Sequence, residues 1–220
     1  MADNYLEKRY DAVFGSGRTT VRRIGHTVDE LMARNRSCRG YNKSFVVTEE
    51  MLRRLVETTT KAPSARNQQV LRYRLVTQGA EATALLACCH MGGALPQMRL
   101  PLPGTEPEAF IVVCSTVEAN PMVYIDLGIA AQSMLLKAAE AGLNGLIIEA
   151  FDHAAARQAL CLPLEPLMVM AIGKSAERHK IVPVDASDSL AYYRDEQGTH
   201  CVPKIRAEQL ILRHEDKNQP

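Results

Sequence analysis

The stretch YIDLGIAAQSMLLKAAEAGLNGLIIEAFD, residues 124–152, decides how the rest of this chain folds. After the polar Asp126, small and apolar residues dominate as far as residue 139, which predicts a helix buried on nearly every side. A glycine-containing turn at residues 142–145 and the apolar run Leu146–Ile148 predict a short buried strand. The strand is expected to end at Glu149-Ala150, where we expect the chemistry to take place.

The composition is typical of a globular chain with one sizeable core. The 220 residues are 46% hydrophobic and 23% charged, and the net charge of +1 argues against a dedicated nucleic-acid binder. No apolar run approaches the ~20 residues that a membrane span requires. The first residues lack the apolar core of a secretory signal. We therefore expect a cytoplasmic protein with no nucleic-acid or membrane partner.

The six cysteines do not form a pattern that predicts a metal site. They include no C-x-x-C pair and no Cys/His spacing typical of zinc, so we expect no bound metal and reduced thiols. Cys88-Cys89-His90 could supply a thiol nucleophile. Small apolar residues in a helix over 80–90 are the better interpretation of this pair.

Four apolar segments predict the core strands, near residues 70–77, 109–116, 146–149 and 167–173. Helices are expected between them, one capped by Thr48, one over 80–90, and one over 153–160 capped by Asp152. This order predicts an α+β fold, with helices around a central sheet.

The remaining segments are expected to be loops or extensions. Residues 1–33 are predicted to form helices around a break at Gly15-Ser16-Gly17. We expect this segment to be an extension that packs on the body or on a partner subunit. Residues 92–107 are rich in Gly and Pro and predict a long loop of the kind that often serves as a lid. The segment around Pro183 is also expected to be a loop.

Several familiar motifs are incomplete here. Ile172-Gly173-Lys174-Ser175 lacks the first glycine of a P-loop, because Met168 stands in its place. No serine lies in a G-x-S-x-G elbow, and Asp152-His153 has no nucleophile in a recognisable setting.

Polar segments that suit an anionic, heteroaromatic ligand occur in a definite order along the chain. Arginine and lysine donate charge-assisted hydrogen bonds to phosphate, and Asn and Gln can both donate to and accept from a ring edge. Each segment alone is more typical of a surface or a turn, and only their order and spacing together are specific. The segments are Arg36-Ser37-x-Arg39, Ser64-x-x-Asn67-x-Gln69, Glu149-Ala150 and Lys204-x-Arg206.

This order resembles the FMN-dependent nitroreductase family. Arg36-Ser37-Cys38-Arg39 resembles the family's R-S-x-R motif, although Asn35 stands where many members have another arginine. Residues 62–73 resemble A-P-S-x-x-N-x-Q-P-W-R-F, with Val70-Leu71 in place of Pro-Trp.

Three further matches extend the resemblance over residues 34 to about 212. Asp126 and Gln132 are in register with the family's D-x-G-x-A-x-Q helix. Residues 149–152 resemble its E-G-F-D strand end, with Ala150 in place of glycine. Lys204-x-Arg206 resembles the C-terminal basic pair.

The resemblance implies an interlocked homodimer with a central, mostly antiparallel sheet and with FMN at the interface. Residues 34–220 would form the FMN-binding domain. Phosphate and polar flavin-edge contacts would come from the N-terminal motif and the basic pair, namely Asn35, Arg36, Ser37, Arg39, Lys204 and Arg206. Asn67 and Gln69 would meet the flavin ring and ribityl hydroxyls, the partner chain would supply Pro63, Ser64 and Ala65, and the backbone N–H of Glu149 or Ala150 would face flavin N5.

The implied reaction is carried by the cofactor rather than by a catalytic side chain. NADH or NADPH would reduce FMN, and a nitroaromatic, a quinone or a similar acceptor would then be reduced in a ping-pong cycle. Two alternatives with the same fold are a specialised flavin enzyme, of the flavin-fragmenting or dehalogenating type, and a non-catalytic flavin-binding protein.

Overall fold

The computed structural model describes residues 25–92 and 100–212. Most of the predicted extension over residues 1–33, including Gly15-Ser16-Gly17, lies outside the described residues, as does the middle of the 92–107 loop. The described part begins just before helix α2 (Val28–Arg34). Thr27 caps α2 by accepting from the Glu30 N–H, and Glu30 accepts from the Thr27 N–H in return.

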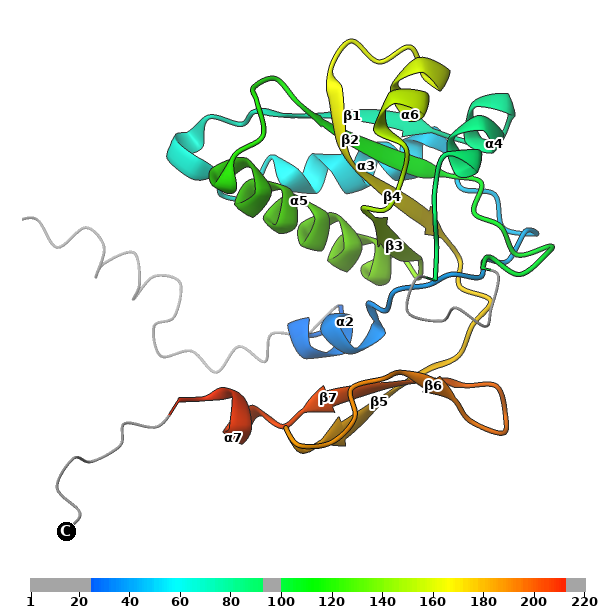
Figure 1. Cartoon of the computed structure of the whole chain (residues 1–220), viewed down its shortest axis with the longest axis vertical. Helices are drawn as coiled ribbons and strands as arrows, with labels where there is room; N and C mark the ends of the chain where they lie inside the picture. The colour runs from blue at the N-terminus through cyan, green and yellow to red at the C-terminus, as the bar shows by residue number, and fades with distance from the viewer. Residues whose placement is uncertain (1–24, 93–99, 213–220) are drawn as a thin grey trace, which may run out of the picture.

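A four-stranded antiparallel sheet forms the centre of the molecule (Figure 1). Its strand order is β1 (Leu71–Val76), β2 (Phe110–Ser115), β4 (Glu165–Gly173) and β3 (Asn144–Ile148). The four predicted strands and the α+β fold are therefore confirmed, although β3 ends one residue before Glu149. All of β2 is buried, and its alternate side chains enter separate cores on the two faces of the sheet.

Helices cover both faces of this sheet. The long helix α5 (Pro121–Glu140) and α3 (Glu49–Thr59) pack on one face, while α4 (Ala80–Ala87) and α6 (His153–Ala159) pack on the other. Thr48 and Asp152 cap α3 and α6 as predicted. Cys88 and Cys89 follow the last turn of α4, because that helix ends at Ala87 rather than at residue 90.

Helix α5 differs from expectation in its start and its burial. It begins at Pro121, because the Asn120 side chain accepts from the N–H groups of Met122 and Val123 and proline suits the first helical position. Met122, Tyr124 and Ile125 are 52%, 53% and 52% exposed. The expectation of burial on nearly every side is therefore wrong for the single chain, in which no described element covers this face.

By length and composition alone, α5 could also cross a membrane. Half of its most apolar window is buried inside the fold, and core helices of soluble proteins meet the same criteria. The expectation that no apolar segment reaches this length is corrected, but the burial gives α5 a sufficient role in the core.

The junction between α5 and β3 is very closely packed. A Cβ atom on Gly145 would lie 2.5 Å from Leu135 Cδ2 and 3.0 Å from the Ala171 carbonyl oxygen. The glycine at this position is therefore needed for the approach of helix and strand rather than for a special backbone conformation.

A second, smaller sheet lies beside α2, away from the main sheet (Figure 1). Its order is β5 (His179–Val184), β7 (His200–Ile205) and β6 (Tyr193–Arg194), with β5 and β7 parallel. The expectation of a loop around Pro183 is wrong. Proline is tolerated here because β5 is an edge strand, so the missing N–H interrupts no ladder on the outer side. A short helix, α7 (Ala207–Leu210), follows β7.

Candidate functional site

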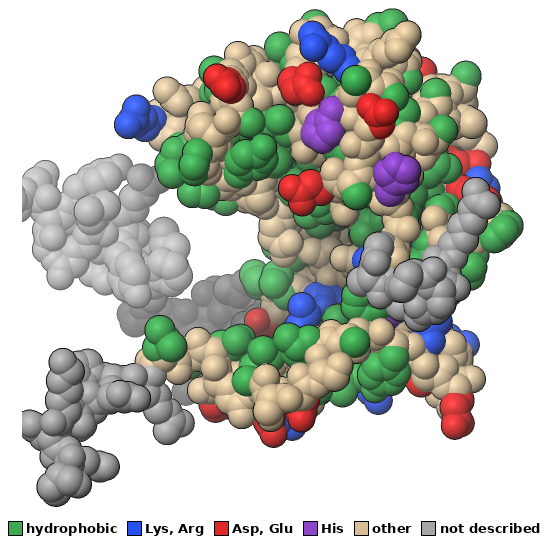
Figure 2. Space-filling view, viewed as in Figure 1, with side chains coloured by type: hydrophobic (Ala, Val, Ile, Leu, Met, Phe, Trp, Pro, Cys, Tyr) green, Lys and Arg blue, Asp and Glu red, His purple; other side chains and the backbone are tan. Residues whose placement is uncertain are grey.

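A cleft of about 690 Å³ lies between the main body and the small sheet. This volume is in the range of small-molecule sites. Figure 2 shows the hollow between the two parts, with Lys and Arg side chains at its inner end. The residues that line the cleft come from α2 and the segment after it, α5, β3, the small sheet and α7: Met32, Asn35, Arg36, Ser37, Arg39, Gln132, Leu135, Gly145, Ile147, His179, Leu190, Tyr192, His200, Val202, Pro203, Lys204, Ile205 and Leu210.

The end of α2 positions the first polar group of the cleft. Asn35 is the C-cap of α2, and its side-chain amide donates to Gln132 Oε1 on α5 at 3.4 Å. The Arg36 guanidinium donates to the carbonyls of Asn35 at 2.5 Å and Met32 at 2.7 Å, as expected for a cation near a helix C-terminus. Partial burial lowers the pKa of Arg36. Arg36 is therefore held in place by the helix that it follows.

The next residues join the edge of the main sheet. Ser37 forms a parallel bridge with Gly145, and the Cys38 N–H donates to the Gly145 carbonyl at 3.1 Å. The Cys38 thiol is buried and donates to the Gly40 carbonyl at 3.0 Å, and burial raises its pKa to about 11. Burial also raises the pKa of Cys89, to about 12. Neither thiol is activated as a nucleophile.

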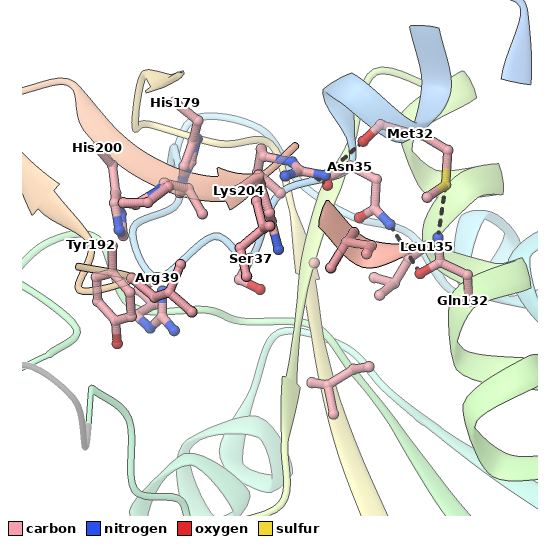
Figure 3. A pocket seen from close by; sticks show the side chains of 18 residues that line it. Met32, Asn35, Ser37, Arg39, Gln132, Leu135, His179, Tyr192, His200 and Lys204 are labelled. Carbon is pink, nitrogen blue, oxygen red and sulfur yellow. Dashed lines mark hydrogen bonds between the residues drawn. The ribbon is translucent and has the colours of Figure 1, made fainter. Parts of the chain in front are cut away.

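An aromatic wall from the small sheet holds the Arg39 side chain. The Arg39 guanidinium lies over the Tyr192 ring, 5.5 Å from its centroid, which is a cation–π contact. The Tyr192 and His200 ring centroids are 5.1 Å apart, and those of His200 and His179 are 5.4 Å apart. In Figure 3 these four residues lie toward one end of the cleft, Asn35 and Gln132 toward the other, and Ser37 and Lys204 between them.

Burial favours the neutral form of both histidines of this wall. Burial lowers the pKa of His179 and of His200 from their ordinary value of 6.5. His179 Nε2 and His200 Nδ1 are buried and find no hydrogen-bond partner within the described residues. A charged His200 would be an additional cation near Arg39 and Arg194, and a charged His179 would be one near Arg194 and Arg36.

The predicted C-terminal basic pair is divided by the structure. Lys204 is in β7 and lines the cleft. Arg206 follows the end of β7, forms an ion pair with the Asp185 carboxylate, and does not line the cleft.

The segment from Pro63 to Gln69 contacts α5 at a different place from the part of α5 that lines the cleft. The Ala65 N–H donates to Oδ1 of the buried Asp126 at 2.8 Å, whereas the cleft meets α5 at Gln132. Six helical residues separate these contacts by about 9 Å along the axis and about 120° around it. A single chain therefore does not bring Pro63, Ser64, Ala65, Asn67 and Gln69 into the cleft.

This segment has an unusual backbone, although it contains no glycine. Arg66, Asn67 and Gln69 have φ values of 52°, 54° and 49°, which side chains other than glycine adopt at a cost. The turn is held by its own side chains, since Ser64 Oγ accepts from the Gln69 N–H at 3.3 Å and Asn67 Oδ1 accepts from Gln69 Nε2 at 3.0 Å.

Glu149 and Ala150 follow β3 and are exposed. The Ala150 carbonyl accepts from the His90 N–H at 2.8 Å, while the Ala150 N–H has no acceptor among the described residues. Ile147, two residues before Glu149, lines the cleft. The strand end is thus near the cleft without lining it.

Sequence reasoning missed the wall formed by His179, Tyr192 and His200, and the buried Glu177 behind it. The β-branched residues at 181, 182 and 184 could have indicated strand β5. The pairing of His179 with His200 could not be read, because it depends on the register of β5 against β7.

Comparison with known proteins places this fold in a family. The model of the nitroreductase family matches residues 32–174. None of the curated proteins matches the chain.

Three solved structures illustrate the likeness. An FMN-dependent nitroreductase from Clostridium difficile R20291 is 22% identical with a TM-score of 0.56, and the match covers 68% of this chain and 88% of that one. A variant of the FMN and NADPH-dependent nitroreductase NfnB from sphigopyxis sp. strain HMH is 20% identical with a TM-score of 0.59, and the match covers 69% of this chain and 89% of that one. A nitroreductase family protein from Streptococcus pneumoniae TIGR4 is 16% identical with a TM-score of 0.57, and the match covers 74% of this chain and 96% of that one. At these identities the structures establish a shared fold.

Acidification is expected to destabilise the folded chain through His179 and His200. Their pKa values are lower in the folded than in the unfolded state, so the unfolded state binds more protons as the pH falls below 6.5. Urea unfolding of the cofactor-free protein between about pH 8 and about pH 5 should show this loss of stability. The double variant His179→Gln/His200→Gln should show a shallower pH dependence, and an unchanged slope would contradict the assignment.

Proposed function

Since the chain belongs to the nitroreductase family, we propose that it is an FMN-dependent oxidoreductase that uses NADH or NADPH to reduce a small organic acceptor, such as a nitroaromatic or a quinone. Family membership supports the oxidoreductase activity. The observation that carries the cofactor assignment is the convergence of Arg36, Ser37 and Arg39 with Lys204, which are distant in sequence, on one cleft.

The lining of the cleft suits FMN in charge and in polarity. Arg36, Arg39 and Lys204 are cationic, Ser37 adds a hydroxyl, and no Asp or Glu is among the lining residues that the structure describes. Such a set favours a phosphate. Leu135, Ile147, Leu190 and Val202 provide apolar surface for a ring system, and the amides of Asn35 and Gln132 can pair with polar ring edges.

The chain would bind and orient FMN, and bound FMN would supply the hydride chemistry. Arg36, Ser37, Arg39 and Lys204 would hold its phosphate and polar edge, and the free N–H at Ala150, or that of Glu149, would face the ring. Arg206 is a proposed member of this set, and its contribution requires that it exchange Asp185 for the ligand. A ping-pong cycle follows if NAD(P)H and the acceptor use the same open side of the cleft.

We also propose that two chains form the complete site. In a homodimer, Pro63, Ser64, Ala65, Asn67 and Gln69 of one chain would reach the cofactor of the other. Their separation from the cleft within one chain and the exposed apolar face of α5 support this arrangement. Gly128 is on the same helix, and a Cβ added there would meet nothing within 4 Å of it in this chain, so another helix can approach closely. Residues 34–220 would be the FMN-binding domain, and residues 1–33 an extension.

The purified protein is expected to be yellow and to show flavin absorbance that NADH or NADPH bleaches under anaerobic conditions. Bound FMN that neither nucleotide bleaches would favour a specialised flavin enzyme supplied by another electron donor. Bleaching without turnover of a panel of nitroaromatic and quinone acceptors would favour a non-catalytic role. A colourless protein that does not bind added FMN contradicts the proposal.

Lys204→Ala should weaken FMN binding by about 1.5–3 kcal/mol, because it removes a charge-assisted contact to the cofactor. Titration monitored by flavin fluorescence gives this value directly. Lys180→Ala is a matched control, since Lys180 is an exposed lysine of the same small sheet that does not line the cleft. Equal affinities of the two variants would remove Lys204 from the site.

Ile125→Lys should convert the protein to a monomer and reduce FMN retention, because it places a charge on the proposed interface of α5. Light scattering coupled to size-exclusion chromatography measures the mass, and the absorbance ratio measures retained flavin. Val46→Lys serves as a control, because Val46 is 58% exposed and outside α5. A dimeric Ile125→Lys variant with full flavin content argues against this interface.

A further inference from the structure

A buried carboxylate lies behind the cationic end of the cleft and is not among its lining residues. The Glu177 side chain is only 9% exposed. Its Oε2 accepts from the backbone N–H of Arg39 at 2.7 Å and from that of Gly40 at 3.2 Å. Two successive backbone amides on one charged oxygen fix the path of the chain at Arg39.

The approach between these segments is close and has further contacts. A Cβ atom on Gly40 would lie 3.3 Å from Glu177 Cγ. The Ala176 N–H donates to the Gly40 carbonyl at 2.9 Å, and Ser175 Oγ accepts from the Glu177 N–H at 3.0 Å. Glu177 is thus held by its own segment while it holds the segment of Arg39.

The same carboxylate also supports the wall that holds the Arg39 side chain. Glu177 Oε1 accepts from Arg194 Nη2 at 2.6 Å, and Arg194 pairs with His200 in the β6–β7 register. His200 packs against Tyr192, whose ring lies under the Arg39 guanidinium. The backbone and the side chain of Arg39 therefore depend on one carboxylate from two directions.

Glu177 remains ionised in this environment. Burial raises its pKa, but the Arg39 N–H and the Arg194 guanidinium outweigh burial, so the net pKa is lowered. His179 Nε2 lies 3.7 Å from Glu177 Oε2. The pKa of His179 is lowered, so this ring is uncharged at any pH above that pKa. A buried charge that is satisfied on both oxygens is expected to hold a fixed geometry.

We infer that Glu177 is a positioning residue that aims Arg39 at an electron-rich oxygen of the bound flavin. This inference rests on the function proposed above. The oxygen can belong to the phosphate or to the pyrimidine edge of the ring, and both offer the same chemistry to a guanidinium.

The test compares Glu177→Ala, Glu177→Gln and Arg39→Ala with the wild type in three measurements. These are the dissociation constants of FMN and of riboflavin, which lacks the phosphate, and the midpoint potential of the bound flavin. Glu81→Ala is the control, since Glu81 forms an exposed ion pair with Arg74 away from the cleft.

If Arg39 contacts the phosphate, Glu177→Ala should reduce the preference for FMN over riboflavin roughly tenfold and leave riboflavin binding unchanged. If Arg39 contacts the ring edge, the preference should persist and the midpoint potential should fall by about 30 mV, which corresponds to a tenfold loss of preference for the reduced form. Glu177→Gln retains an oxygen acceptor for the two amides, so it should show a smaller change of the same kind. Arg39→Ala should change the same one of these two quantities as Glu177→Ala. Glu81→Ala should change neither the preference for FMN nor the midpoint potential.

A purely structural role would lower the melting temperature and weaken both flavins equally, with the preference and the potential unchanged, and this outcome overturns the inference. If Glu177→Ala does not fold, Glu177→Gln decides the test. A Glu177→Gln variant with the wild-type preference for FMN and the wild-type midpoint potential also overturns the inference. A wild type that binds neither flavin overturns the proposed function together with the inference. If the wild type binds FMN and the Glu177 variants show the wild-type preference for FMN and the wild-type midpoint potential, only the inference is overturned.

Discussion

The close packing of α5 against β3 at Gly145 determines where the rest of the molecule can lie. Because Gly145 has no side chain, Leu135 packs directly against the strand. β3 is an edge strand of the main sheet, so its outer edge can pair with the segment after α2. Ser37 and Cys38 pair with Gly145 at that edge. Gly145 therefore contacts the core helix, the main sheet and the segment of the N-terminal arginine motif, and a larger residue would have to displace Leu135 of the helix or the neighbouring strand β4.

The cleft lies between the main body and the small sheet, and both sides contribute cations and apolar side chains to it. The main body supplies two of the cations, Arg36 and Arg39, and the amides of Asn35 and Gln132. The small sheet and the segments next to it supply Lys204, the wall of Tyr192, His179 and His200, and much of the apolar lining. Cations on both sides repel each other when no anion lies between them. The buried Glu177 offsets part of this repulsion from behind Arg39 without occupying the cleft itself.

Much of the fold was predictable from local patterns, for identifiable reasons. The strands over 110–115 and 166–173 are buried on both faces, so each is almost entirely apolar. The caps at Thr48 and Asp152 act within one turn and need no distant partner. Burial of α5 was overestimated, because an apolar residue such as Ile125 looks the same in sequence whether its own chain or another surface covers it.

By itself, the sequence determined the four core strands, the small-residue helix and the polar motifs that led to the nitroreductase family. These depend on short-range spacing and residue type, which the chain carries locally. Only the tertiary structure decided that Arg36, Ser37, Arg39 and Lys204 share a cleft, and that Arg206 and the turn at Ser64–Gln69 lie outside it in the single chain. The registers of Ser37 on Gly145 and of His179 on His200 are long-range pairings, so no local pattern encodes them.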